Sequence, residues 1–228
     1  MKTKLDEGYG VTIELRWYRA CLASLEIRAL FIFFVGESMI TNRTMPTIEL
    51  DKVILRTLLK KDAKDFYDVG CDPITTEFLT WGPFKTIKEA KSMIKFTYFR
   101  RMARQEPIGY AILDKESLKM IGTIEFHTFN QKLNTCEIGY VLARPYWNQG
   151  IMTDCVKAMT ELAFNHLEVD RVIIKHIKEN MASQRVILKA GYRFIEINKQ
   201  SFFHPKTHRF HDVYIYEKWR NQQHDQQS

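Results

Sequence analysis

The sequence has few cysteines, and their spacing excludes the two roles that cysteines most often serve in small domains. Cys21, Cys71, Cys136 and Cys155 are far apart, and none belongs to a Cys-x-x-Cys pair or to a Cys/His ligand pattern. A disulfide framework and a zinc site both need closer or paired spacing. We therefore expect reduced thiols in a cytoplasmic protein that uses no metal.

Histidine is more frequent but equally poor as a metal signal. Four of the seven histidines lie in the last quarter of the chain: His204, His208, His211 and His224. His204 and His208 would meet on a helix, but the surrounding FFHPKTHRFHDVYIY predicts strand, turn and strand. The pattern therefore argues against a metal site formed by these histidines.

Long apolar runs are also missing. The longest apolar run of the N-terminal region, Ala29–Val35, has seven residues, whereas a bilayer span needs roughly 20. The mixed charges before it do not resemble a secretory signal. We expect no membrane association and interpret residues 1–47 as an N-terminal extension. It is either an amphipathic appendage or a stretch upstream of a native start at Met39 or Met45.

No segment of the chain carries a dense block of one charge. The net charge of +7 comes from 34 Lys and Arg residues against 27 Asp and Glu residues, dispersed along the sequence. We expect no direct nucleic-acid binding, although a basic protein suits an anionic small molecule. A content of 45% hydrophobic and 13% aromatic residues indicates a folded domain.

The hydrophobic periodicity alternates between strand and helix from residue 48 onward. It predicts, in order, a strand, two helices, three strands, a helix, a strand, a helix and two strands. The corresponding ranges are Lys52–Leu59; Lys60–Gly70 and Thr86–Gln105; Ile108–Asp114, Met120–Phe129 and Cys136–Ala143; a helix after Gly150; Arg171–Ile177; Asn180–Tyr192; and Phe194–Ile197 and His211–Trp219. We predict one α+β domain over 48–220 with α/β/α layers and a mixed, mostly antiparallel sheet of about seven strands, followed by a flexible tail at 221–228.

The segment ARPYWNQGIMTDC, residues 143–155, connects a strand to a helix through one glycine. The first backbone N–H groups of a helix have no intrahelical acceptor, and with the helix dipole they attract phosphate. Asn148 and Gly150 tolerate unusual backbone angles, and Thr153 adds a hydroxyl. Because nearly every helix begins in this way, the segment alone fits either a phosphate site or an ordinary helix start.

The order of the elements around this segment resembles the GNAT superfamily of N-acetyltransferases. In particular, it resembles the branch that includes the ribosomal-protein alanine and serine N-terminal acetyltransferases. Four passages over 48–220 carry the resemblance: EFLTWGPFKTIKEA, EIGYVLARPYWNQGIMTDCVKAMTELAF, NMASQRVILKAGYRF and HDVYIYEKW. The turn departs from the superfamily pattern at Trp147, Asn148 and Met152, which affect the shape of the turn more than the backbone groups that would hold phosphate.

The resemblance implies acetyl-CoA as co-substrate, bound in a V-shaped opening between the strand ending near Leu142 and the strand starting near Arg171. Pantetheine amides would pair with the backbone of the first strand, the turn would hold the pyrophosphate, and the next helix would reach the sulfur. The residues implied are Val141, Leu142 and Ala143; Asn148, Gln149, Gly150, Ile151, Met152 and Thr153; and Asn180, Ser183 and Lys189. A substrate amine would attack the thioester directly.

Such a reaction needs a base, and the predicted meander offers two carboxylates. Glu137 shares a strand face with Gly139 and Val141 by the period-2 rule and is the preferred candidate. Its alternative role is a structural glutamate paired with a nearby Lys or Arg. Glu125 is the second candidate, although a solvent-facing position is its simpler interpretation.

The reaction also needs a group that protonates the CoA thiolate. Many superfamily members carry a tyrosine seven residues after the asparagine, where this chain has Ile187, so Ser183 becomes the candidate. Tyr192 and Cys155 are interpreted as core residues. The acceptor would be a protein N-terminus or a small-molecule amine, selected by the first two helices, the 71–85 loop and a basic loop over 198–211. The alternative function is a non-catalytic acyl-CoA-binding module, and the chain would be a monomer or a homodimer.

Overall fold

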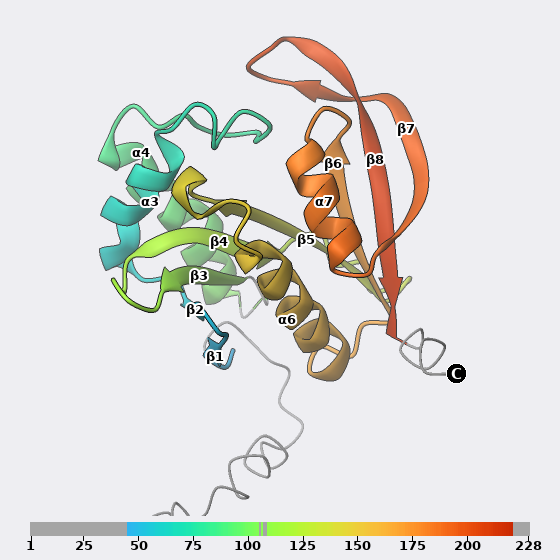
Figure 1. Ribbon diagram of the computed structural model, residues 1–228, viewed down its shortest axis with the longest axis horizontal. Helices are drawn as coiled ribbons and strands as arrows, with labels where there is room; N and C mark the ends of the chain where they lie inside the picture. Colours follow the sequence, from blue (N-terminus) through green and yellow to red (C-terminus); the bar gives the residue numbers. More distant parts are fainter. Residues whose placement is uncertain (1–44, 105, 107–108, 221–228) are drawn as a thin grey trace, which may run out of the picture. The chain divides into compact units, whose positions relative to one another are not determined.

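The computed structural model describes residues 45–104, 106 and 109–220 (Figure 1). The predictions for residues 1–44 and for the tail after Arg220 lie outside the described residues. The centre of the fold is a sheet with the strand order β1-β2-β3-β4-β5-β6-β8-β7. All neighbours are antiparallel except β5 and β6, which run parallel. The predicted open, mostly antiparallel sheet is confirmed, with one short extra strand.

The strands follow the predicted order closely. Their bounds are β1 Ile48–Glu49, β2 Val53–Thr57, β3 Gly109–Asp114, β4 Met120–Phe126, β5 Thr135–Leu142, β6 Arg171–Ile177, β7 Arg193–His204 and β8 Arg209–Trp219. Strands β3 and β4 are buried on both faces, which explains their nearly continuous apolar sequence. Period-2 alternation sends Tyr110 and Ile112 to one core cluster and Ala111 and Leu113 to the other.

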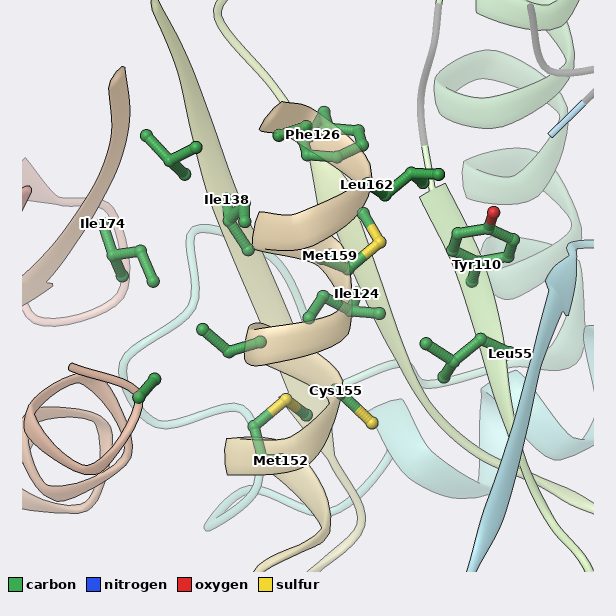
Figure 2. Close-up of a cluster of buried hydrophobic side chains, with 14 of the residues drawn as sticks. Leu55, Tyr110, Ile124, Phe126, Ile138, Met152, Cys155, Met159, Leu162 and Ile174 are labelled. Atoms are coloured by element: carbon green, nitrogen blue, oxygen red, sulfur yellow. The ribbon is translucent and has the colours of Figure 1, made fainter. Parts of the chain in front are cut away.

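Helices cover the two faces of the sheet and make these two cores. One face carries η3 Lys60–Asp62, α3 Ala63–Gly70, α4 Ile87–Met93, the π-helical η4 Ile94–Phe99 and α5 Arg100–Ala103. The other carries η5 Arg144–Tyr146, α6 Ile151–Asn165 and α7 Met181–Lys189. Figure 2 shows Met152, Cys155, Met159 and Leu162 of α6 beside strand residues such as Ile124 and Ile138.

The helix predicted over Thr86–Gln105 is present as the α4–η4–α5 segment. It begins as expected, with the Thr86 hydroxyl accepting a hydrogen bond from the Glu89 backbone N–H at 3.4 Å. Its middle six residues widen into a π-helix, a feature that is frequent at functional sites. The interpretation of Cys155 and Tyr192 as core residues is confirmed, since both are buried.

The loop predicted over 198–211 is wrong. Strand β7 continues to His204 and β8 starts at Arg209, so only residues 205–208 form the turn. The polar segment after Ile197 lies within β7, where the pairing with β8 shifts register between Asn198 and Phe202. Gln200 takes a φ of 49° at this irregularity. The polar segment is therefore an irregularity inside a paired strand and not a loop.

Candidate functional site

The site begins where β5 and β6 separate. Their parallel pairing joins Thr135, Cys136 and Glu137 to Arg171, Val172 and Ile173, and no further pair between these strands occurs among the described residues. Beyond Glu137 the strands diverge (Figure 1). The backbone of β5 that faces β6 is thus open to pairing with an extended ligand.

A cavity of about 520 Å³ occupies this separation and reaches both faces of the sheet. Glu125, Glu137 and Thr123 line it on the face covered by the α3–α4 segment. Tyr140, Asn180 and Ser183 line it on the face covered by α6 and α7. Two molecules could therefore meet between the strands from opposite sides.

The turn between β5 and α6 is held in shape by its side chains. Trp147 Nε1 donates to the Leu142 carbonyl oxygen at 2.6 Å, and Gln149 Nε2 donates to the Pro145 carbonyl oxygen at 3.0 Å. Asn148 has a φ of 59° and Gly150 a φ of 83°, as their tolerance of such angles led us to expect. A Cβ placed on Gly150 would meet nothing within 4 Å.

The first residues of α6 bury their side chains. Ile151, Met152 and Thr153 are all buried, so their side chains pack into the fold. Their backbone N–H groups belong to the first turn, which has no intrahelical acceptors. Chemical recognition at this turn would therefore depend on the backbone.

Glu137 forms a close ion pair across the base of the separation. Its Oε1 lies 2.6 Å from Lys175 Nζ, and Lys175 belongs to β6. The alternative role predicted for Glu137, pairing with a nearby cation, is present in the structure. The pair joins β5 to β6 just beyond their last backbone pair.

Glu125 lies deeper in the cavity, opposite Gly139 in the β4–β5 pairing. Only 20% of its side chain is exposed, so the solvent-facing interpretation was wrong. Burial raises the pKa of Glu125 to about 7, and the guanidinium of Arg101 opposes part of this rise, with Nη1 3.9 Å from Oε2. Arg101 belongs to α5 and also donates to the Phe126 carbonyl oxygen at 2.9 Å.

On the opposite face, Asn180 caps α7. Its Oδ1 accepts the Ser183 N–H at 3.0 Å, and Ser183 Oγ lies 2.8 Å from the Tyr140 hydroxyl oxygen. Sequence reasoning missed Tyr140, although period 2 places it on the face away from Glu137. Ile187, at the position where the superfamily often has tyrosine, is fully buried.

Other predicted residues lie outside this cavity. The lining includes Val141 but not Leu142, Ala143 or the turn at 148–153, which follow at the end of β5. Lys189 is exposed in the last turn of α7. Burial raises the pKa of the Cys136 and Cys155 thiols to about 12, so neither is a thiolate near neutral pH.

The basic rim expected on the 198–211 segment is only partly present. His204 is buried, with Nε2 3.1 Å from the Glu77 carbonyl oxygen, and burial lowers its pKa. The Lys206 ammonium donates to the Thr76 carbonyl oxygen. The hairpin tip therefore holds the 71–85 loop, whose residues 78–81 line the cavity.

Two further absences concern the described part of the chain. It contains no group of three or more His, Cys, Asp or Glu residues that could hold a metal ion, and His224 lies beyond it. Within the same ranges, no helix has the length and apolar character needed to cross a bilayer.

The comparisons with known proteins agree with this geometry. Residues 52–193 match the acetyltransferase (GNAT) domain family, so the chain belongs to that family and is an acyltransferase. It is 27% identical over 162 residues to the uncharacterized N-acetyltransferase YoaA of Bacillus subtilis, covering 71% of this chain and 91% of the relative. It is also 27% identical over 154 residues to the ribosomal-protein-serine acetyltransferase of Escherichia coli, covering 65% and 83%.

A solved structure shares the fold. The microcin C7 self-immunity acetyltransferase MccE, in complex with acetyl-CoA and AMP, superimposes with a TM-score of 0.66. The sequences are 21% identical, and the match covers 75% of this chain and 93% of that one. Acetyl-CoA-dependent acetylation is the activity that membership of this family implies.

Proposed function

We propose that the protein moves an acetyl group from acetyl-CoA to a primary amine by direct attack within a ternary complex. The observation that carries this proposal is the cavity that reaches both faces of the sheet between β5 and β6. Carboxylates line one face and the capped start of α7 lines the other. Amine and thioester can thus approach from opposite sides, as direct transfer requires.

Acetyl-CoA would lie along the open part of β5 and against the start of α6. The backbone of Val141, Leu142 and Ala143 would pair with the pantetheine amides, and the turn from Asn148 to Thr153 would hold the pyrophosphate. The open space beside Gly150 and the buried side chains that follow it support this placement. Asn180 and Ser183 would lie near the sulfur end, and a contact from the exposed Lys189 stays a prediction.

Glu125 is the base that we propose for removing the ammonium proton. A general base works best when its pKa lies near the working pH, and burial brings Glu125 to about 7. Glu137, the candidate preferred from the sequence, would first have to give up its 2.6 Å contact with Lys175. In this scheme Glu137 and Lys175 hold the base of the opening, and Glu125 acts directly or through water.

The acceptor would enter beside the 71–85 loop and the β7–β8 hairpin. Phe78, Trp81 and Phe202 give this side of the cavity an aromatic wall near the two carboxylates. A protein N-terminus or a small-molecule amine fits this combination. The Escherichia coli relative is a ribosomal-protein-serine acetyltransferase, which supports a protein as acceptor.

The test is acetyl-CoA-dependent release of free thiol with a panel of amines. The panel contains peptides with N-terminal serine or alanine, the same peptides with a blocked N-terminus, and simple alkyl and aryl amines. We expect thiol release with at least one free amine and none with the blocked peptides. CoA binding without amine-dependent release across the panel would instead indicate a non-catalytic acyl-CoA-binding module.

A further inference from the structure

The Tyr140 hydroxyl, which pairs with Ser183 between β5 and α7, has no role in the scheme above. The Tyr140 hydroxyl oxygen lies 2.8 Å from Ser183 Oγ and 3.4 Å from the Ser183 carbonyl oxygen. Both residues line the cavity between the separated strands. They come from two different elements, so the pair joins the strand to the first turn of the helix across the cofactor side of the opening.

The hydrogen-bond arrangement allows one hydroxyl hydrogen to point into the cavity, provided that the Tyr140 hydroxyl donates to Ser183 Oγ rather than to the more distant Ser183 carbonyl oxygen. The Ser183 backbone N–H is already used by Asn180 Oδ1, which fixes the first turn of α7. Two neighbouring hydroxyls carry two hydrogens, and the bond between them uses only one. When Tyr140 donates to Ser183 Oγ, the serine hydrogen is free to point into the cavity.

We propose that Tyr140 is a positioning residue that orients the Ser183 hydroxyl toward the sulfur of the bound thioester, where negative charge develops as the acetyl group leaves. This inference rests on the proposed function and adds a residue to it. A donor fixed in advance stabilises developing charge without reorganising during the reaction. A chain of hydrogen bonds also polarises its last donor, so Tyr140 strengthens Ser183 as well as orienting it.

The surrounding core shows why this hydroxyl must come from the strand. Ile187, one turn after Ser183, is fully buried and has no polar group to offer. The Tyr192 hydroxyl is used by Thr160 Oγ1 at 2.6 Å inside the core. Tyr140 is the one tyrosine among the cavity-lining residues of the described chain, and its hydroxyl reaches Ser183 of α7.

The pair need not lose a proton in this role. The amine nitrogen forms a bond to the acetyl carbon, the carbon–sulfur bond breaks, and its electron pair stays on sulfur. One ammonium proton goes to Glu125, and the nitrogen releases a second proton that neutralises the thiolate. Burial raises the pKa of Tyr140 far above neutrality, so its hydroxyl remains a donor throughout.

The test compares Tyr140→Phe with a matched control, Tyr192→Phe. Both changes remove one hydroxyl from a pair of hydrogen-bonded hydroxyls, but Tyr192 does not line the cavity. We expect Tyr140→Phe to lower kcat by roughly tenfold to a hundredfold while KM for acetyl-CoA changes little. Tyr192→Phe should leave kcat unchanged.

A second readout does not depend on turnover. A hydrogen bond to the thiolate lowers the pKa of the thiol of bound CoA, which can be followed by the ultraviolet absorbance of the thiolate during a pH titration. We expect this pKa to rise by about one pH unit in Tyr140→Phe and to stay unchanged in Tyr192→Phe. Ser183→Ala should produce at least the same rise, and adding Tyr140→Phe to it should have little further effect.

The outcomes separate the two proposals. If CoA binds but its thiol pKa is the same in Tyr140→Phe and in the unchanged protein, the role of Tyr140 is overturned. Fully additive losses of kcat from Tyr140→Phe and Ser183→Ala would overturn it as well, because the residues would then act independently. If the unchanged protein does not bind CoA at all, the proposed function fails, and this inference fails with it.

Discussion

Replacing Glu125 with glutamine should stabilise the fold above neutral pH while it slows acetyl transfer. Burial of the carboxylate raises the pKa of Glu125 from the ordinary 4.5 to about 7. The folded protein therefore prefers the protonated, neutral form, which glutamine imitates in shape and charge. Two properties of the variant should change in opposite directions.

The size and pH range of the stability effect follow from the two pKa values. Below pH 4.5 the Glu125 carboxyl is protonated in both the folded and the unfolded chain, so it does not lower the free energy of unfolding. As the pH rises the unfolded chain ionises first, and the cost to the fold grows until about pH 7, above which it is constant. A separation of about 2.5 pH units corresponds to roughly 3 kcal/mol.

Urea unfolding at several pH values would measure this effect. We expect Glu125→Gln and the unchanged protein to be equally stable near pH 4.5 and to differ by roughly 3 kcal/mol at pH 8, with the variant more stable. Glu137→Gln is the control, because its half-exposed partner Lys175 makes the ion pair worth about 1 kcal/mol or less. The difference in unfolding free energy between Glu125→Gln and the unchanged protein should therefore grow with pH. If this difference stays constant from pH 5 to pH 8, the argument that burial disfavours the ionised Glu125 carboxylate is refuted.

The kinetic half of the prediction uses the same variant. With Glu125 as base, kcat/KM of the unchanged protein should fall about tenfold per pH unit below pH 7, because only the carboxylate accepts a proton. Glu125→Gln should lower the rate by about a hundredfold or more and lose this dependence. If Glu137→Gln shows those changes instead, Glu137 is the base that the sequence first indicated.

Three further substitutions test the turn, the sheet and a buried ion pair. Gly150→Glu should weaken CoA binding in a titration, by adding a negative charge beside the phosphates, whereas Gly150→Asn should weaken it much less. Gly122→Ala would press its Cβ against a backbone carbonyl of β5 and should cost about 1–3 kcal/mol, seen as a lower Tm; an unchanged Tm would contradict this close approach. The Asp62 carboxylate lies 2.7 Å from both Nη atoms of Arg56, so Asp62→Ala should lower the free energy of unfolding in urea by about 3 kcal/mol or more. Asp68→Ala, which removes an exposed ion pair, should lower it little. Equal losses in the two variants would refute the distinction between buried and exposed pairs.

Local patterns predicted those parts of the fold that local chemistry determines. Strand β6 has the bounds read from its β-branched run, and Gly191 has the positive φ, 83°, expected of a residue that closes a helix. The same holds for Asn148 and Gly150 in the turn before α6. These residues adopt their backbone angles because of their own chemistry, so one sequence suffices to predict them.

The β7–β8 hairpin shows where such patterns fail. The polar stretch after Ile197 has the composition of a loop, yet pairing with β8 keeps it in a strand that resumes at Phe202. Asn198 and Phe202, which flank the stretch, pair with Val213 and His211, and this tertiary contact overrides local propensity. The spacing of residues within the stretch does not indicate which strand lies beside it.

Tertiary contacts also decide which of the two carboxylates is suited to act as the base. Period 2 places Glu125 and Glu137 on one face of the sheet, because Glu125 pairs with Gly139. What separates them is their surroundings: Lys175 approaches Glu137 from β6, while Arg101 and the helix that contains the π-helical segment enclose Glu125. Charge partners and desolvation set a carboxyl pKa, and both depend on which elements pack together. The residue type of a base can thus be read from the sequence, whereas its readiness to accept a proton near neutral pH depends on the folded structure.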